Sequence, residues 1–161
     1  MVSEEFIRSD TYKQIATAVN RITNSLDADR STLFLVDRER GQLVAEVAEG
    51  VEEVEIRVQL GEGIAGQCAK FGKEIRHDDA YSHEGFKNNF DQETGYQTKS
   101  VIAVPVFSKV HDNNVIGVIE VLNKHTGRFT KDDEDILKMF SNVIGMVIES
   151  KIQLEGIVPE G

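Results

Sequence analysis

The sequence is poor in cysteine and in positive charge, and it contains no long apolar run. Cys68 is the only cysteine among 161 residues, which excludes an internal disulfide framework and suits a reducing cytoplasm. No stretch reaches the roughly 18 apolar residues that a membrane span needs. The acidic first residues lack the apolar segment of a secretory signal peptide. We therefore expect a cytoplasmic protein.

The scarcity of lysine and arginine limits the class of partner. The chain has 28 acidic and 18 basic residues, a formal net charge of −10. Nucleic acids and anionic membranes are bound through basic groups that neutralise phosphates, so neither is expected as a partner. A small anion remains possible, provided that backbone N–H groups at the N-terminus of a helix hold it.

Groups that carry catalysis or hold metals are also scarce. Four histidines show no metal-ligand spacing, and one cysteine does not support a zinc site. Neither a serine nucleophile elbow nor a phosphate-binding Walker loop is present. The sequence therefore predicts no metal, no cofactor and no catalytic residue.

The hydrophobic pattern predicts one α+β domain with helices at both ends. Apolar residues recur every three or four positions from Tyr12 to Leu26 and from Ile136 to Ile148, which is typical of amphipathic helices. Between these helices, alternating or continuous apolar runs predict strands joined largely by hairpins. Strands are expected at 32–36, 43–47, 54–60, 75–77, 101–107 and 115–122, with a short helix at 64–70. The expected class is a six-stranded antiparallel sheet flanked by helices, divided into an N-terminal helix (1–29), a core with the C-terminal helix (30–155) and a tail or linker (156–161).

Two features of this arrangement suggest function. The polar stretch 78–99 has no clear period and is long for a connection, as functional lids often are. The apolar faces of the terminal helices exceed what one sheet can cover, which favours a homodimer joined through a four-helix bundle. The alternative is that both helices only cover their own sheet.

The most specific motif lies in residues 123–134, which we term the signature segment. Its Asn123-Lys124, Phe129 and Asp133-Glu134 resemble the signature of cyclic-nucleotide-binding GAF domains. Residues 30–37, 63–66, 79–81 and 91–98 are similar to the tandem GAF modules of cyanobacterial adenylyl cyclases and cyclic nucleotide phosphodiesterases. The similarity extends over roughly residues 10–155. It implies a GAF fold and a regulatory module that binds a cyclic nucleotide and controls an attached effector domain.

The resemblance also implies which residues contact the ligand. The helix opened by Gly63 would offer its N–H groups to the cyclic phosphate, in agreement with the anion preference of helix N-termini. Arg30 could stack on a purine, or it could be a surface arginine paired with Asp27 or Asp29. Thr94 and Thr98 could cap the ligand, or they could be exposed threonines of a loop. The implied ligand-binding residues are Arg30, Thr32, Ala48, Glu49, Ile64, Ala65, Lys87, Asp91, Thr94, Thr98 and Glu120.

Three positions carry more specific expectations. Glu120 interrupts an apolar strand, and alternation with Val118 and Ile116 points it inward, so it needs a donor from a ligand, Lys124 or a backbone amide. A solvated sheet face at this point is the alternative. In phosphodiesterase-type pockets, an aromatic residue that stacks on the base precedes an acid that bonds guanine. Here that pair is Ala48-Glu49. Glu49 keeps the acid with a longer side chain, but Ala48 cannot stack and is closer to the cyanobacterial cyclase pattern, which favours cyclic AMP over cyclic GMP.

The signature segment itself has an implied structural role. In the family, Lys124 and Asp133 form an ion pair that joins the last strand to the last helix.

Other functions known for GAF domains fit less well. Free methionine sulfoxide reduction needs several cysteines, and Cys68 is at the wrong place for a bilin link. The remaining alternatives are a domain for another small metabolite and a ligand-free dimerisation module, with an enzyme last.

Overall fold

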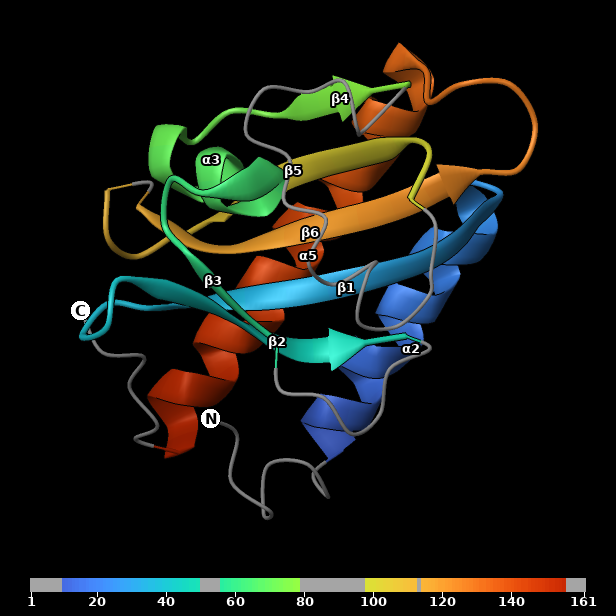
Figure 1. Ribbon diagram of the computed structural model, residues 1–161. Coiled ribbons are helices and arrows are strands. Elements are labelled where there is room, and N and C mark those ends of the chain that lie inside the picture. Colours follow the sequence, from blue (N-terminus) through green and yellow to red (C-terminus); the bar gives the residue numbers. More distant parts are fainter. Residues whose placement is uncertain (1–9, 50–55, 79–97, 113, 156–161) are drawn as a thin grey trace.

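The computed structural model describes residues 10–49, 56–78, 98–112 and 114–155 of the chain (Figure 1). Three helices and six strands lie in these ranges. The helices are α2 (Asp10–Ser25), α3 (Gly63–Phe71) and α5 (Lys131–Glu155). The strands are β1 (Ala28–Asp37), β2 (Gln42–Ala48), β3 (Arg57–Gln59), β4 (Ile75–His77), β5 (Val101–Phe107) and β6 (Val115–Lys124).

The six strands form one antiparallel sheet in the order β3-β2-β1-β6-β5-β4, which confirms the expected α+β class. Hairpins join β1 to β2 and β5 to β6. The long strands β1 and β6 form the centre, where Thr32 pairs with Glu120. Figure 1 shows α2 and α5 on one face of this sheet and α3 on the other.

The face of the sheet that α2 and α5 cover, which we term the helix face, carries the larger apolar core. Ile15, Val19 and Ile22 of α2 are buried at the spacing that the sequence predicted. They pack in one cluster with Leu33 of β1 and Leu137 of α5. The expected N-terminal helix thus shares its core with the sheet.

The α3 face carries a second, smaller core. Ile64, Ala65 and Cys68 of α3 pack there against Phe34 and Val118 from the two central strands. Gly72 ends α3 in the left-handed conformation, with φ of 63°, and its N–H donates to the Cys68 carbonyl at 2.9 Å. Both faces of the sheet are therefore buried, one against α2 and α5 and the other against the shorter helix α3.

The N-terminus of α5 is fixed by a reciprocal cap between Thr130 and Asp133. The Asp133 N–H donates to Thr130 Oγ1 at 3.1 Å, and the Thr130 N–H donates to Asp133 Oδ2 at 2.9 Å. Such a pair satisfies two of the N–H groups that a helix start leaves without partners. The first turn also holds Asp132 and Glu134, whose negative charge suits the helix dipole.

Candidate functional site

Three of the predicted ligand residues lie in one line across the sheet. Thr32 of β1 pairs with Ala48 of β2 on one side and with Glu120 of β6 on the other. Residues directly opposite one another on neighbouring strands share a face of the sheet. Thr32 alternates with Leu33 of the helix-face core, so this cross-strand row lies on the α3 face.

Burial and charge distinguish the members of the cross-strand row. Thr32 is buried, whereas Ala48 and Glu120 are half-buried. The Glu120 carboxylate lies close enough to α3 to raise the pKa of the Cys68 thiol, although burial is the larger cause and Glu74 also contributes. Val118 shares the face of Glu120 as predicted. Ile116 packs on the opposite face, because the β5–β6 register shifts next to Phe107.

The start of α3 lies on the same face as the cross-strand row. Ile64 and Ala65, in its first turn, are buried in the cluster that includes Phe34 and Leu122. Gly63 has a φ of 66°, a left-handed conformation that glycine adopts without strain, and it turns the chain into the helix. The side chain of Glu62 makes no capping hydrogen bond. The start of α3 therefore brings its first N–H groups to the same face of the sheet as the cross-strand row.

The other predicted ligand residues fall into three groups. Arg30 is half-buried and lies two residues before Thr32 on the same strand, opposite Leu122. Thr98 is buried in the segment that leads into β5, outside the cross-strand row. Lys87, Asp91 and Thr94 lie outside the described residues, as does most of the polar stretch that was expected to form a lid.

Glu49 is not brought together with the cross-strand row, which corrects its expected position. Its carboxylate accepts hydrogen bonds from the Ser31 N–H at 2.9 Å, the Asn20 amide at 2.9 Å and the Thr23 hydroxyl. Thr23 and Asn20 belong to α2, and Ser31 contacts Thr23 at 2.6 Å. The Glu49 carboxylate therefore lies on the face of the sheet that α2 and α5 cover, opposite the α3 face. Glu49 thus joins α2 to the first residues of β1.

Sequence reasoning missed this polar cluster, although a signal for it was present. Ser31 alternates with Thr32 and so occupies a position that faces the helix core. Thr23 follows Val19 by four residues on the apolar side of α2, and both polar side chains are buried. Two buried hydroxyls at such positions require partners, and an acid is a strong acceptor for them.

The implied ion pair of the signature segment is present. Lys124 Nζ lies 3.2 Å from Asp133 Oδ2 and donates to the Leu26 carbonyl at 2.7 Å. The two side chains are only 15% and 9% exposed. A single ammonium group thus joins the end of β6, the chain after α2 and the first turn of α5.

The other signature residues also have structural partners. Asn123 accepts hydrogen bonds from the Lys99 N–H at 2.5 Å and the Ser100 N–H at 3.1 Å, which holds the entry of β5 against β6. Phe129 is buried in the helix-face core. Glu134 pairs with Lys131 at 2.8 Å and Lys138 at 3.2 Å. Burial raises its pKa, but these two lysines outweigh burial and lower the pKa overall.

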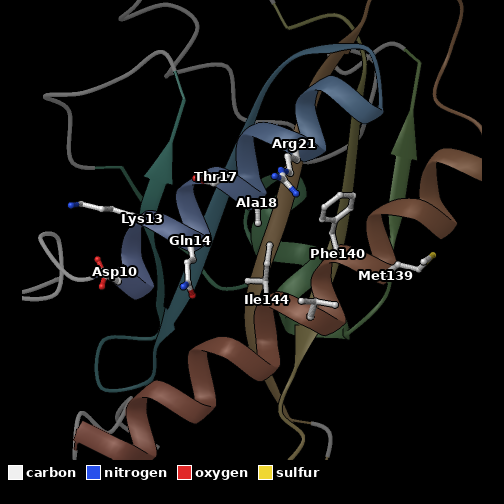
Figure 2. Close-up of a pocket in the computed structure, with 10 residues that line it drawn as sticks. Asp10, Lys13, Gln14, Thr17, Ala18, Arg21, Met139, Phe140 and Ile144 are labelled. Atoms are coloured by element: carbon white, nitrogen blue, oxygen red, sulfur yellow. The ribbon is translucent and has the colours of Figure 1, made fainter.

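A second candidate surface lies on the opposite face of the molecule. An open groove of about 690 Å³ lies between α2 and α5, and Figure 2 shows the side chains that line it. Met139 and Val143 of α5 contribute exposed apolar side chains to it, and Lys13 and Arg21 of α2 contribute charge. The full lining is Asp10, Lys13, Gln14, Thr17, Ala18, Arg21, Met139, Phe140, Val143 and Ile144.

Two kinds of site are absent from the described part of the chain. Its His, Cys, Asp and Glu side chains form no group of three that could hold a metal ion. None of its helices has an apolar stretch long enough to cross a bilayer.

Comparison with known proteins identifies relatives of this chain. A family model described as the GAF domain matches residues 11–148. The chain is 36% identical over 146 residues to a probable 3′,5′-cyclic phosphodiesterase from Caenorhabditis elegans, covering 83% of this chain and 20% of that protein. It is 33% identical over 138 residues to a dual cyclic-AMP and cyclic-GMP phosphodiesterase from Takifugu rubripes, covering 78% of this chain and 15% of that protein. The chain therefore spans a fifth or less of these relatives.

Solved structures agree on the fold. The GAF domain of a phosphoenolpyruvate-protein phosphotransferase from Coxiella burnetii superposes with a TM-score of 0.80 at 18% identity, covering 96% of this chain and 92% of that one. A free methionine-R-sulfoxide reductase from Neisseria meningitidis superposes with a TM-score of 0.75 at 22% identity, covering 90% of this chain and 81% of that one. At such low identity these likenesses concern the arrangement of elements and not the chemistry of the site.

Proposed function

Because this chain belongs to the GAF domain family, we propose that it is a regulatory domain that binds a cyclic nucleotide, prefers cyclic AMP and controls an attached effector domain. The observation that carries the proposal is the cross-strand row of Thr32, Ala48 and Glu120 on the face of α3. A row of small and polar groups beside the start of a helix suits a ligand that has both an anionic and a polar end.

The preference for cyclic AMP rests on the two residues at the end of β2. Ala48 has no ring to stack on a base, and the Glu49 carboxylate is hydrogen-bonded toward α2. Neither residue offers the stacking and acidic contacts that the resemblance associates with guanine. Thr32 and Glu120 are the polar groups of the row, and the Thr32 hydroxyl can serve a base or a ribose because it both donates and accepts.

A regulatory role without catalysis fits the chemistry of the only cysteine. Cys68 is fully buried in α3, and burial raises the pKa of its thiol. The thiolate is the nucleophilic form of cysteine, so a buried thiol with a raised pKa is inert at neutral pH. The fold is shared with methionine sulfoxide reductases, but this chain lacks the set of cysteines that their reaction requires.

Isothermal titration calorimetry with cyclic AMP, cyclic GMP and non-cyclic nucleotides tests the proposal. We expect cyclic AMP to bind with a Kd below about 1 μM and more tightly than cyclic GMP. Tighter binding of cyclic GMP would overturn the base preference alone. Absence of heat with both cyclic nucleotides would overturn the ligand class.

Two neighbouring hydroxyls provide a matched pair of variants for that titration. Thr32→Val removes the hydroxyl of the cross-strand row while keeping the side-chain shape, and we expect affinity to fall about 3–10-fold. Ser31→Ala removes a hydroxyl from the opposite face of the same strand, where it contacts Thr23. We expect Ser31→Ala to leave affinity unchanged. Equal losses in the two variants would indicate a general effect on β1 and contradict a direct contact at Thr32.

We further propose that two copies pair through the groove between α2 and α5. Met139, Val143 and Met146 follow one another at spacings of four and three along α5, and they are 68%, 54% and 52% exposed. In a twofold pair, Lys13 and Arg21 of one copy would face Asp132 at the start of the other copy's α5, because a twofold interface is self-complementary. Charge complementarity at the rim and an apolar centre are typical of protein interfaces.

Light scattering coupled to size-exclusion chromatography tests this pairing. We expect the chain to have twice its monomer mass and Val143→Asp to have the monomer mass, because a buried unpaired carboxylate in the interface is costly. Val110→Asp is the control, since Val110 is 50% exposed on the β5–β6 hairpin, away from the groove. A monomeric parent chain, or loss of pairing in both variants, would contradict an interface at the groove.

A further inference from the structure

A histidine lies between two carboxylates at the point where three elements meet. His125 directly follows β6 and is half-exposed. Its Nδ1 lies 3.0 Å from Asp27 Oδ1, in the turn after α2, and its Nε2 lies 2.8 Å from Asp29 Oδ1, at the start of β1. The His125 N–H also donates to the Asp27 carbonyl at 2.8 Å.

The two ring contacts depend on the protonation state. A neutral imidazole has one N–H and one lone pair, so it can donate to one carboxylate only. At the other nitrogen, the lone pair would face a carboxylate oxygen, which is repulsive. Only the imidazolium, with N–H groups at both nitrogens, can satisfy both carboxylates at these distances.

The contacts of Asp29 extend the cluster to β5. Its other oxygen accepts a hydrogen bond from the Asn123 amide at 3.2 Å. The carbonyl oxygen of the Asn123 side chain accepts from the Lys99 and Ser100 N–H groups before β5. The charge on His125 is thus connected, through one carboxylate and one amide, to the residues that lead into β5.

We propose that His125 is a proton-operated clamp, which joins the turn after α2 and the start of β1 to the end of β6 when both ring nitrogens carry protons. Loss of one proton releases one carboxylate and loosens the connection. This device is independent of the ligand proposed above, because none of its contacts belongs to the cross-strand row or to α3.

A second, adjacent connection involves no imidazole. Lys124 joins the Leu26 carbonyl to Asp133 within the same region. Among the described residues, other charged side chains close in sequence to these contacts are Arg30 beside Asp29, Lys99 before β5, and Arg128, which pairs with Asp78 at 3.4 Å. The imidazole is therefore the group in this set whose ordinary pKa lies near neutrality.

The sign of the pH dependence follows from the pKa of His125. Hydrogen bonds to Asp27 and then to Asp29 raise it above its ordinary value of 6.5. A group with a raised pKa in the folded state contributes stability below its ordinary pKa and loses that contribution as the pH rises through the raised value. The clamp is therefore closed below the ordinary pKa and opens as the pH rises through the raised pKa of His125.

Nitrogen-edited NMR of the histidine rings between pH 5.5 and 9 tests the clamp, with His125→Gln to assign the signal. We expect His125 to titrate above its ordinary value with both ring nitrogens protonated at the acidic end. In Asp27→Asn and Asp29→Asn the titration midpoint should fall toward the ordinary value, because each variant removes one carboxylate. A midpoint at or below the ordinary value, or one that neither variant moves, would overturn the clamp.

A double-mutant cycle measures whether the clamp contributes to the fold. Melting temperatures of the parent chain, His125→Gln, Asp29→Asn and the double variant give the coupling between the two side chains. We expect a coupling on the order of 1–3 °C at pH 6 that disappears at pH 9. These exposed positions tolerate substitution, so all four proteins should fold. A coupling of equal size at both pH values would show a contact that does not depend on the proton, and the clamp would be rejected.

Discussion

Replacing Asp133 with alanine should lower the free energy of unfolding by about 3–5 kcal/mol, because it leaves a buried ammonium without its carboxylate. Lys124 would retain only the Leu26 carbonyl as an acceptor in the described structure. The Thr130 N–H would also lose the oxygen that accepts its hydrogen bond at the start of α5. Urea titration followed by circular dichroism measures the change.

Asp135 provides the control for this prediction. It lies two residues along the same helix and pairs with Lys131 at 2.9 Å, but these side chains are 56% and 65% exposed. Exposed pairs contribute at most about 1 kcal/mol, so Asp135→Ala should change stability little. The double variant Lys124→Met/Asp133→Leu should recover part of the loss, since it removes both charges from the interior.

The outcome decides the role of the signature segment. We expect Asp133→Ala to weaken nucleotide binding as well, although Asp133 lies at the start of α5 and not on the α3 face. An unchanged melting temperature together with unchanged affinity would contradict this indirect role. A loss of affinity without any loss of stability would mean that the segment acts on the ligand more directly than its position on the helix face indicates.

The elements of the fold were predictable because local patterns determine them. Alternation predicted β2, a run of β-branched residues predicted β6, and the spacing of Ile15, Val19 and Ile22 predicted the buried face of α2. The cap at Thr130 was also predictable, since its partner Asp133 lies three residues further along the chain. In each case the residues that determine the element are close in sequence, so the sequence pattern predicts it.

The orientation of side chains near strand ends was not predictable in the same way. Lys124 was one expected donor for Glu120, because residues four apart on a strand share a face. Asn123 adopts a φ of 60°, which breaks the alternation and turns Lys124 toward the helices. A single left-handed residue therefore reassigned a charged group from one face of the sheet to the other.

Glu49 illustrates a second limit of prediction from the sequence, because partners that are distant in the sequence determine where its side chain points. The acid was expected to face a base, but the Thr23 and Asn20 side chains of α2 bind its carboxylate. These partners are separated from Glu49 by 26 and 29 positions, and the β1–β2 register shifts between Leu33 and Phe34. Neither the packing of α2 nor the bulge has a periodic signature in the sequence.

The largest effect on the proposed site is expected from Gly66→Ala. A Cβ at Gly66 would overlap the Gln59 carbonyl oxygen of β3 and lie 3.2 Å from the Gly61 backbone nitrogen. The Gly66 carbonyl also accepts a hydrogen bond from the Gly61 N–H at 2.8 Å, so the backbone has little freedom to move apart. A methyl group here therefore has to displace α3 from the sheet.

This displacement should affect both stability and binding. Overpacking of a close contact costs about 1–3 kcal/mol, which urea titration would measure. The first turn of α3, with Ile64 and Ala65, would move with the helix, so we expect the affinity for the cyclic nucleotide to fall at least about tenfold. Circular dichroism at 10 °C establishes that the variant is folded before its affinity is measured.

Gln67→Ala separates this effect from a general weakening of α3. Gln67 is the next residue of the same helix and is half-buried, and alanine favours the helical conformation there. We expect its affinity and stability to match those of the parent chain. If Gly66→Ala were folded and bound the nucleotide as tightly as Gln67→Ala, the start of α3 could not be part of the site, and the anion would have to be held elsewhere along the cross-strand row.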